Sequence, residues 1–61
     1  METFAERLSK LRKRIGFNQD YFASEVGVSI DTVRRWEGGK QEPRLSDLIS
    51  IAQVLGTSIN E

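Results

Sequence analysis

The sequence is constrained most by a tight turn at its centre, Gly27-Val28-Ser29, which separates two short segments with apolar residues at helical spacing. Asn18 is an N-cap candidate for the first segment and Ser29 for the second. Gly27 suits the left-handed residue that often ends a helix. Two short helices joined by a glycine-containing turn form either a helix-turn-helix or an ordinary helical hairpin, and the turn alone does not decide between them.

Apolar residues that recur every three or four positions predict four helices. The first covers about residues 3–15 and ends at Gly16, with its apolar face formed by Phe4, Leu8, Leu11 and Ile15. In the two central helices, the inward residues are Phe22, Ala23 and Val26, and then Val33 and Trp36. We expect a polar loop over residues 40–43 and a last helix that Gly56 closes, with its apolar face formed by Leu45, Leu48, Ile51, Ala52 and Leu55.

With 61 residues and neither cysteine nor histidine, the chain has room for one domain, residues 1–61, and no disulfide or Cys/His zinc site. The four helices predicted above make the fold class all-α, and no metal and no cofactor are expected. Ser58 is a candidate cap for one more turn containing Ile59. This ending favours either an N-terminal domain of a longer chain or a very short last helix.

The distribution of charged residues along the chain indicates what kind of partner the protein binds. Nine basic and nine acidic residues give zero net charge, which argues mildly against nucleic acid. The basic residues nevertheless cluster, and a neutral protein can present one basic face. The clusters are Arg7, Lys10, Arg12, Lys13 and Arg14, then Arg34 and Arg35, with Lys40 and Arg44 beyond. No apolar run approaches a membrane span, so we expect a soluble, cytoplasmic protein with no membrane partner.

Several motifs occur together in a characteristic order. They are Leu8-Ser9-Lys10-Leu11-Arg12, Asn18-Gln19, Phe22-Ala23, Gly27-Val28-Ser29, Trp36-Glu37-Gly38-Gly39-Lys40-Gln41-Glu42-Pro43 and Leu55-Gly56. In this order the sequence resembles the phage repressor and Cro type of helix-turn-helix domain, the lambda repressor-like or XRE family, over nearly the whole chain. There are two departures: Phe22 stands where leucine is usual, and Arg44 stands where serine often caps the last helix, which predicts a weaker cap.

The resemblance implies a compact bundle of four to five helices. It also implies a DNA-binding transcription regulator, because members are mostly bacterial or phage transcription regulators, and we expect this one to be a repressor. Members of the family bind near-palindromic operators as homodimers, which places two recognition helices about one DNA turn apart. The second helix crosses the backbone of double-stranded DNA, and the third enters the major groove. The antitoxin and adaptor modules with this fold remain the alternative. An enzyme with a small-molecule substrate is disfavoured, because the sequence has no phosphate-cradling glycine loop and no convincing acid–base pair.

Four residues are predicted to read bases from the exposed face of the third helix: Ile30, Asp31, Thr32 and Arg35. Arg35 would donate to guanine, Asp31 would accept from a cytosine amino group, and Ile30 would meet a thymine methyl. Other roles stay open. Ile30 could be half-buried against the second helix, Asp31 could serve the helix dipole, Thr32 could be solvated, and Arg35 could pair with Asp31.

The resemblance also assigns residues to the DNA backbone and to the fold. The predicted backbone contacts are Asn18, Gln19, Ser29, Arg34, Lys40 and Arg44. Gln19 would donate to a phosphate beside the N-terminus of the second helix, and the alternative for it is a solvated side chain. Lys40 and Arg44 flank a loop that could equally be only solvated. Arg12 and Glu37 match a partly buried ion pair that ties the first helix to the end of the third.

Overall fold

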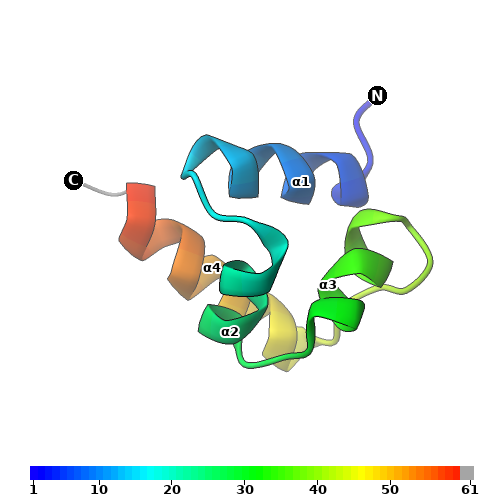
Figure 1. Ribbon diagram of the computed structural model, residues 1–61. Coiled ribbons are helices and arrows are strands. Elements are labelled where there is room, and N and C mark those ends of the chain that lie inside the picture. The colour runs from blue at the N-terminus through cyan, green and yellow to red at the C-terminus, as the bar shows by residue number, and fades with distance from the viewer. Residues whose placement is uncertain (60–61) are drawn as a thin grey trace.

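The computed structural model describes the backbone of residues 1–59 and the side chains of residues 1–56. Four helices follow one another: α1 (Phe4–Arg14), α2 (Gln19–Val26), α3 (Ile30–Glu37) and α4 (Leu45–Ile59). No strand occurs within residues 1–59. Figure 1 shows α1 across the top of the molecule, with α2 and α3 below it and α4 behind α2. The predicted all-α fold class is confirmed.

Side chains stabilise the first turn of each of the first three helices. Asn18 Oδ1 accepts from the Tyr21 N–H at 2.8 Å, and Ser29 Oγ accepts from the Thr32 N–H at 3.2 Å. These are the two caps predicted for α2 and α3. Each cap satisfies one backbone donor that a helix N-terminus otherwise leaves unpaired.

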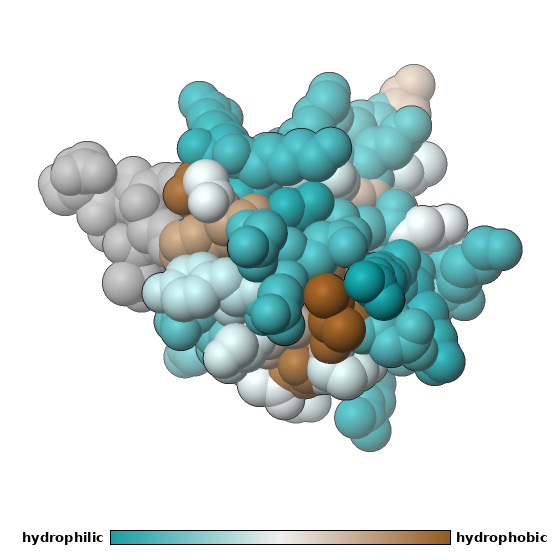
Figure 2. Space-filling view, viewed as in Figure 1, coloured by the Kyte–Doolittle hydropathy of each residue, from teal (hydrophilic) through white to brown (hydrophobic). Residues whose placement is uncertain are grey.

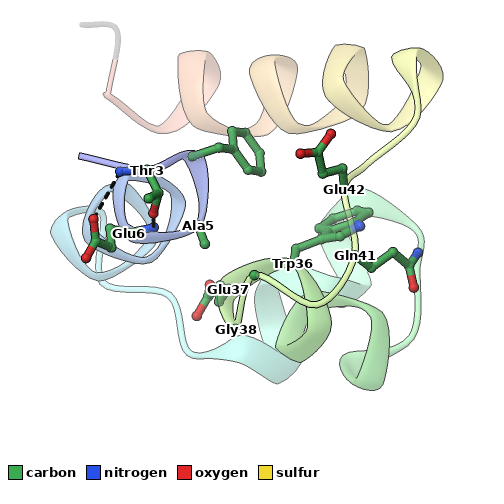
Figure 3. Close-up of a pocket in the computed structure, with 10 residues that line it drawn as sticks. Thr3, Ala5, Glu6, Trp36, Glu37, Gly38, Gln41 and Glu42 are labelled. Carbon is green, nitrogen blue, oxygen red and sulfur yellow. Dashed lines mark hydrogen bonds between the residues drawn. The ribbon is translucent and has the colours of Figure 1, made fainter. Parts of the chain in front are cut away.

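A reciprocal capping box, which was not predicted, begins α1. Thr3 Oγ1 accepts from the Glu6 N–H at 3.2 Å, and Glu6 Oε1 accepts from the Thr3 N–H at 3.0 Å. Figure 3 shows both bonds as dashed lines. The signal for it was present, because a threonine followed three positions later by a glutamate is the usual sequence signature of this box.

The central turn has the predicted geometry. Gly27 has a φ of +91°, in the left-handed region that an L side chain rarely adopts. The N–H groups of Gly27 and Val28 both donate to the Ala23 carbonyl, at 2.8 and 2.9 Å. Because Ser29 caps α3 two residues later, the chain reverses direction within three residues and brings α3 against α2.

The core lies where α2 and α3 meet α1 and α4, and each of the four helices contributes some of its predicted inward residues. Its fully buried members include Trp36, Phe22, Leu8 and Val33, none more than 2% exposed. The remaining buried apolar residues are Ala23, Val26, Ile51 and Leu55. Each large apolar side chain buried in this way contributes roughly 1.5–3 kcal/mol to stability. This cluster fixes α3 with Val33 and Trp36 inward and therefore fixes which of its residues face outward.

The apolar faces predicted for α1 and α4 included residues that are exposed in the structure. In α1, Leu8 is buried and Leu11 and Ile15 pack partly against the core, but Phe4 in the first turn is 42% exposed. In α4, Ile51 and Leu55 are buried, whereas Leu45, Leu48 and Ala52 are exposed. The buried face of α4 is instead completed by Val54, which lies about 60° from Ile51 on the side away from Ala52.

The prediction that Gly56 closes the last helix was wrong, because α4 continues to Ile59. Ser58 therefore lies within α4 and does not cap a separate turn. Glycine inside a helix costs roughly 0.5–1 kcal/mol relative to alanine, and this local preference is readily outweighed by the packing of adjacent residues such as Leu55. At the other end of α4, the Arg44 N–H donates to Asp47 Oδ2 at 3.1 Å. Asp47 thus supplies a cap that the Arg44 side chain cannot.

Candidate nucleic-acid interface

The outward face of α3 carries an exposed ion pair. Arg35 Nη2 lies 2.7 Å from Asp31 Oδ2, and the two side chains are 57% and 59% exposed. Residues four apart lie one turn apart on the same side of a helix, so the pair is built by α3 alone. Arg34, the neighbour of Arg35 in sequence, is also exposed but points about 100° away around the helix. The outward face of α3 therefore presents the planar guanidinium of Arg35, a hydrogen-bond donor, beside the short Asp31 carboxylate, an acceptor.

The other two predicted base-reading residues are less available than Asp31 and Arg35. Ile30 is partly buried and packs against the core. Thr32 is also partly buried, and its Oγ1 lies 2.9 Å from Ser29 Oγ, in a hydrogen bond that either hydroxyl can donate. Ile30 is therefore held by the core, and Thr32 is held by a hydrogen bond at the start of α3.

The predicted backbone contacts fall at the helix starts and in the loop after α3. Asn18 and Ser29 are exposed, and each already caps a helix. The Lys40 side chain is exposed, while its backbone N–H donates to the Arg35 carbonyl at 2.9 Å and fixes the start of the loop to α3. The Arg44 guanidinium is 87% exposed, with Nε 3.7 Å from Asp47 Oδ2. On the face viewed in Figure 2, where α2 lies in front of α4, hydrophilic side chains predominate.

A buried arginine–carboxylate pair lies inside the molecule and joins α1 to α3. Arg12 Nε donates to Glu37 Oε2 at 2.7 Å, and Nη2 donates to Glu37 Oε1 at 3.1 Å. Arg12 Nη1 donates to the Phe17 carbonyl at 2.7 Å, in the link before α2. The two charged side chains are 8% and 6% exposed, so the pair is more buried than the resemblance implied. A bidentate arginine–carboxylate pair of this kind fixes both orientation and distance.

Gln19, the first residue of α2, also binds to this buried pair. Its Nε2 donates to Glu37 Oε1 at 3.0 Å, and the residue is partly buried. Glu37 therefore accepts three hydrogen bonds, from Arg12 and from Gln19. Gln19 is predicted to bind a phosphate, but its contact with Glu37 was not predicted, because 18 positions separate the two residues and no local pattern links them.

No other feature of the described residues forms a candidate site as well defined as the outward face of α3. A hollow of about 450 Å³ lies between the N-terminal turn of α1 and the loop after α3, with Trp36 beneath the segment that carries Gln41 and Glu42 (Figure 3). Among the described residues, the buried Trp36 indole Nε1 has no hydrogen-bond partner.

No group of three or more metal-binding side chains gathers among the described residues. No described helix has the length and apolar character needed to cross a membrane.

An ion pair between Lys10 on α1 and Glu2, which precedes the helix, shifts the pKa values of both side chains. Lys10 Nζ lies 2.6 Å from Glu2 Oε2. The hydrogen bond from Lys10 lowers the pKa of the Glu2 carboxyl below its ordinary value, and the same bond raises the pKa of the Lys10 ammonium. Neither residue lies on α3, which carries Asp31 and Arg35.

Comparison with known proteins identifies the family to which the chain belongs. A family model described as helix-turn-helix matches residues 8–61. The chain therefore belongs to the helix-turn-helix family, which confirms the resemblance found in its motifs. No solved structure gives a significant match.

Individual relatives are similar along nearly the whole chain. It is 38% identical over 56 residues to the cryptic phage CTXphi transcriptional repressor RstR of Vibrio cholerae, covering 92% of this chain and 50% of that protein. It is 36% identical over 55 residues to the SPbeta prophage-derived regulator YonR of Bacillus subtilis, covering 90% and 51%. It is 42% identical over 57 residues to (S)-2-hydroxypropylphosphonic acid epoxidase of Streptomyces wedmorensis, covering 92% and 29%. The chain thus spans about half the length of the two regulators and less than a third of the epoxidase.

Proposed function

We propose that this chain is a sequence-specific transcription regulator that binds double-stranded DNA through the major groove. The observation that carries the proposal is the outward face of α3, where Asp31 and Arg35 stand one turn apart in a helix-turn-helix domain. Arg35 would donate to guanine O6 and N7, and Asp31 would accept from a cytosine amino group. Thr32 and the exposed part of Ile30 would add contacts near the start of α3.

Contacts to the DNA backbone would hold α3 in register. Gln19 would donate to a phosphate at the start of α2, with Asn18 and Ser29 close to the two helix N-termini, where unpaired backbone N–H groups favour an anion. Arg34, Lys40 and Arg44 would supply positive charge around α3 and the loop that follows it. Such contacts position a protein on the duplex and carry no sequence information by themselves.

Two copies of the chain would bind one operator. A near-palindromic site read by a homodimer places equivalent recognition helices about 34 Å apart, one turn of DNA. The similarity to a phage repressor supports repression as the outcome, with action in the cytoplasm. We propose no cofactor and no catalytic role. The similarity to an epoxidase does not oppose this, because it covers only 29% of that protein.

A salt titration against duplex DNA tests the proposal. The logarithm of the affinity should fall linearly with the logarithm of the salt concentration, with a slope of about 0.9 for each phosphate neutralised. Substituting Lys40 or Arg44 by alanine should lower the slope and weaken binding to all duplexes alike, whereas exposed Lys13 on α1 serves as the matched control. A flat salt response would exclude DNA binding.

A protein-interaction module, such as an antitoxin or adaptor, is the second candidate. The zero net charge of the chain favours it, because DNA-binding domains are typically basic. In that case duplex DNA would bind weakly, without preference among sequences.

A further inference from the structure

We propose that Glu37 is a positioning residue for DNA binding, which holds the Gln19 side-chain amide ready to donate to a phosphate. This inference rests on the proposed function and extends it to a residue that would not itself contact DNA. Its basis is the hydrogen bond of 3.0 Å from Gln19 Nε2 to Glu37 Oε1, at the junction of α1, α2 and α3.

The carboxylate determines which way the Gln19 amide is turned. An ionised carboxylate only accepts hydrogen bonds, so the amide must present its nitrogen to Glu37, and the carbonyl oxygen must point elsewhere. The nitrogen carries two hydrogens, and Glu37 takes one of them. The second hydrogen remains as a donor of fixed orientation at the first residue of α2, beside backbone N–H groups that also favour an anion.

The carboxylate is itself held in place, which makes it a rigid support. Arg12 binds both Glu37 oxygens, at 2.7 and 3.1 Å, and also donates to the Phe17 carbonyl at 2.7 Å. The Glu37 side chain is only 6% exposed, so water competes little for its oxygens. A Gln19 side chain free in solvent would lose rotamer freedom on binding phosphate, whereas a side chain already fixed by Glu37 avoids much of that loss.

The same contact links the two parts of the interface. Glu37 is the last residue of α3, and Gln19 is the first residue of α2. A phosphate held by Gln19 is thereby connected through one carboxylate to the helix proposed to read bases. The buried pair would then serve recognition in addition to stabilising the fold.

The test combines a paired substitution with duplexes that lack one phosphate charge. Arg12→Met with Glu37→Leu removes the support and leaves no unpaired buried charge, and such replacements are often neutral for stability. Binding is measured to a series of duplexes, each of which carries one neutral methylphosphonate in place of a phosphate, at a different position along the site. For the unmodified chain, neutralising one phosphate per half-site should lower the affinity about tenfold, as for one hydrogen bond to a charged group. Gln19→Ala and the paired variant should each lose sensitivity at that same phosphate.

The control is Glu25→Gln, an exposed acid on α2, which should keep the full sensitivity. A purely structural role would leave the position-specific sensitivity of the paired variant intact, and that result would overturn the proposal. So would a phosphate sensitivity that Gln19→Ala does not change. An unmodified chain that binds no duplex would instead remove the proposed function.

A measurement on the free chain needs no variant. The Gln19 side-chain amide should be as ordered as the backbone of α2 in nuclear magnetic relaxation, with an order parameter of about 0.85. A freely moving amide in the absence of DNA would contradict positioning by Glu37.

Discussion

Among the described residues, the Arg12–Glu37 pair and the Arg35–Asp31 pair have the same closest distance, 2.7 Å, in surroundings that differ in almost every other respect. In the pair between α1 and α3, the Arg12 and Glu37 side chains are 8% and 6% exposed. In the pair on α3, the Arg35 and Asp31 side chains are 57% and 59% exposed. Distance alone therefore does not distinguish a structural pair from one that is available to a ligand.

Burial and partners make the distinction. Arg12 and Glu37 come from positions 25 apart and bind further groups, Phe17 and Gln19, so removing either leaves several polar atoms unpaired. Arg35 and Asp31 are one turn apart and remain in contact with water. Because exposed pairs contribute little to stability, Arg35 can leave Asp31 for a base edge at small cost.

The largest expected effect follows from breaking the buried pair. Arg12→Ala should lower the free energy of unfolding by about 3–5 kcal/mol, because it leaves the Glu37 carboxylate buried without its partner. Chemical denaturation measures the loss, with exposed Lys13→Ala as a control that should change stability by about 0.5 kcal/mol or less. Removing both partners should cost less than the sum of the single losses. Additive losses in this double-mutant cycle would show that the pair has no energetic role.

The next effect concerns DNA. Arg35→Ala should leave the fold intact and weaken binding to the best operator by about 1–3 kcal/mol, as expected for one bidentate guanine contact. Preference at one base pair per half-site should relax, while binding to random duplexes changes less. Arg34→Ala is the matched control and should weaken all duplexes alike. If Arg35→Ala also reduces every affinity by the same factor, Arg35 contacts only phosphate.

A smaller effect measures the exposed pair itself. In the absence of DNA, a double-mutant cycle of Asp31→Ala and Arg35→Ala should give a coupling of about 0.2–0.5 kcal/mol. The coupling should shrink when the salt concentration rises from 0.1 M to 1 M, since the screening length falls from about 10 Å to 3 Å. The coupling between Arg12 and Glu37 should be nearly unchanged. Equal salt dependence of the two pairs would contradict the contrast drawn from their burial.

The smallest effect involves the pair between Glu2 and Lys10. Because Lys10 lowers the pKa of Glu2, the ionised pair adds stability above the ordinary glutamate pKa, and that contribution disappears as the pH falls through the lowered value. Titration of the Glu2 carboxyl by nuclear magnetic resonance should return its pKa to the ordinary range in Lys10→Gln. An unchanged pKa would mean that the hydrogen bond does not persist in solution.

Local signals predicted much of the fold. Asn18, Gly27 and Ser29 defined the central turn, because caps and left-handed glycines act within a few residues of themselves. The buried face of α4 was predicted less well, since Leu48 and Val54 have similar apolar character and only packing selects between them.

The candidate site shows the same limit. The helical period predicted that Asp31 and Arg35 share a face and that Val33 and Trp36 point inward. The contact between Gln19 and Glu37 could not be predicted, because it depends on how α2 and α3 pack and on a carboxylate with a free acceptor position.

Selection of bound duplexes from a random pool tests the central claim most directly, that α3 reads DNA sequence through its outward face. The unmodified chain should enrich a near-palindrome whose half-sites lie about 10 base pairs apart, as two recognition helices on one face of DNA require. The same selection with Arg35→Ala should retain the spacing and lose preference at one position in each half-site. A pool that remains random after selection with the unmodified chain would contradict the account.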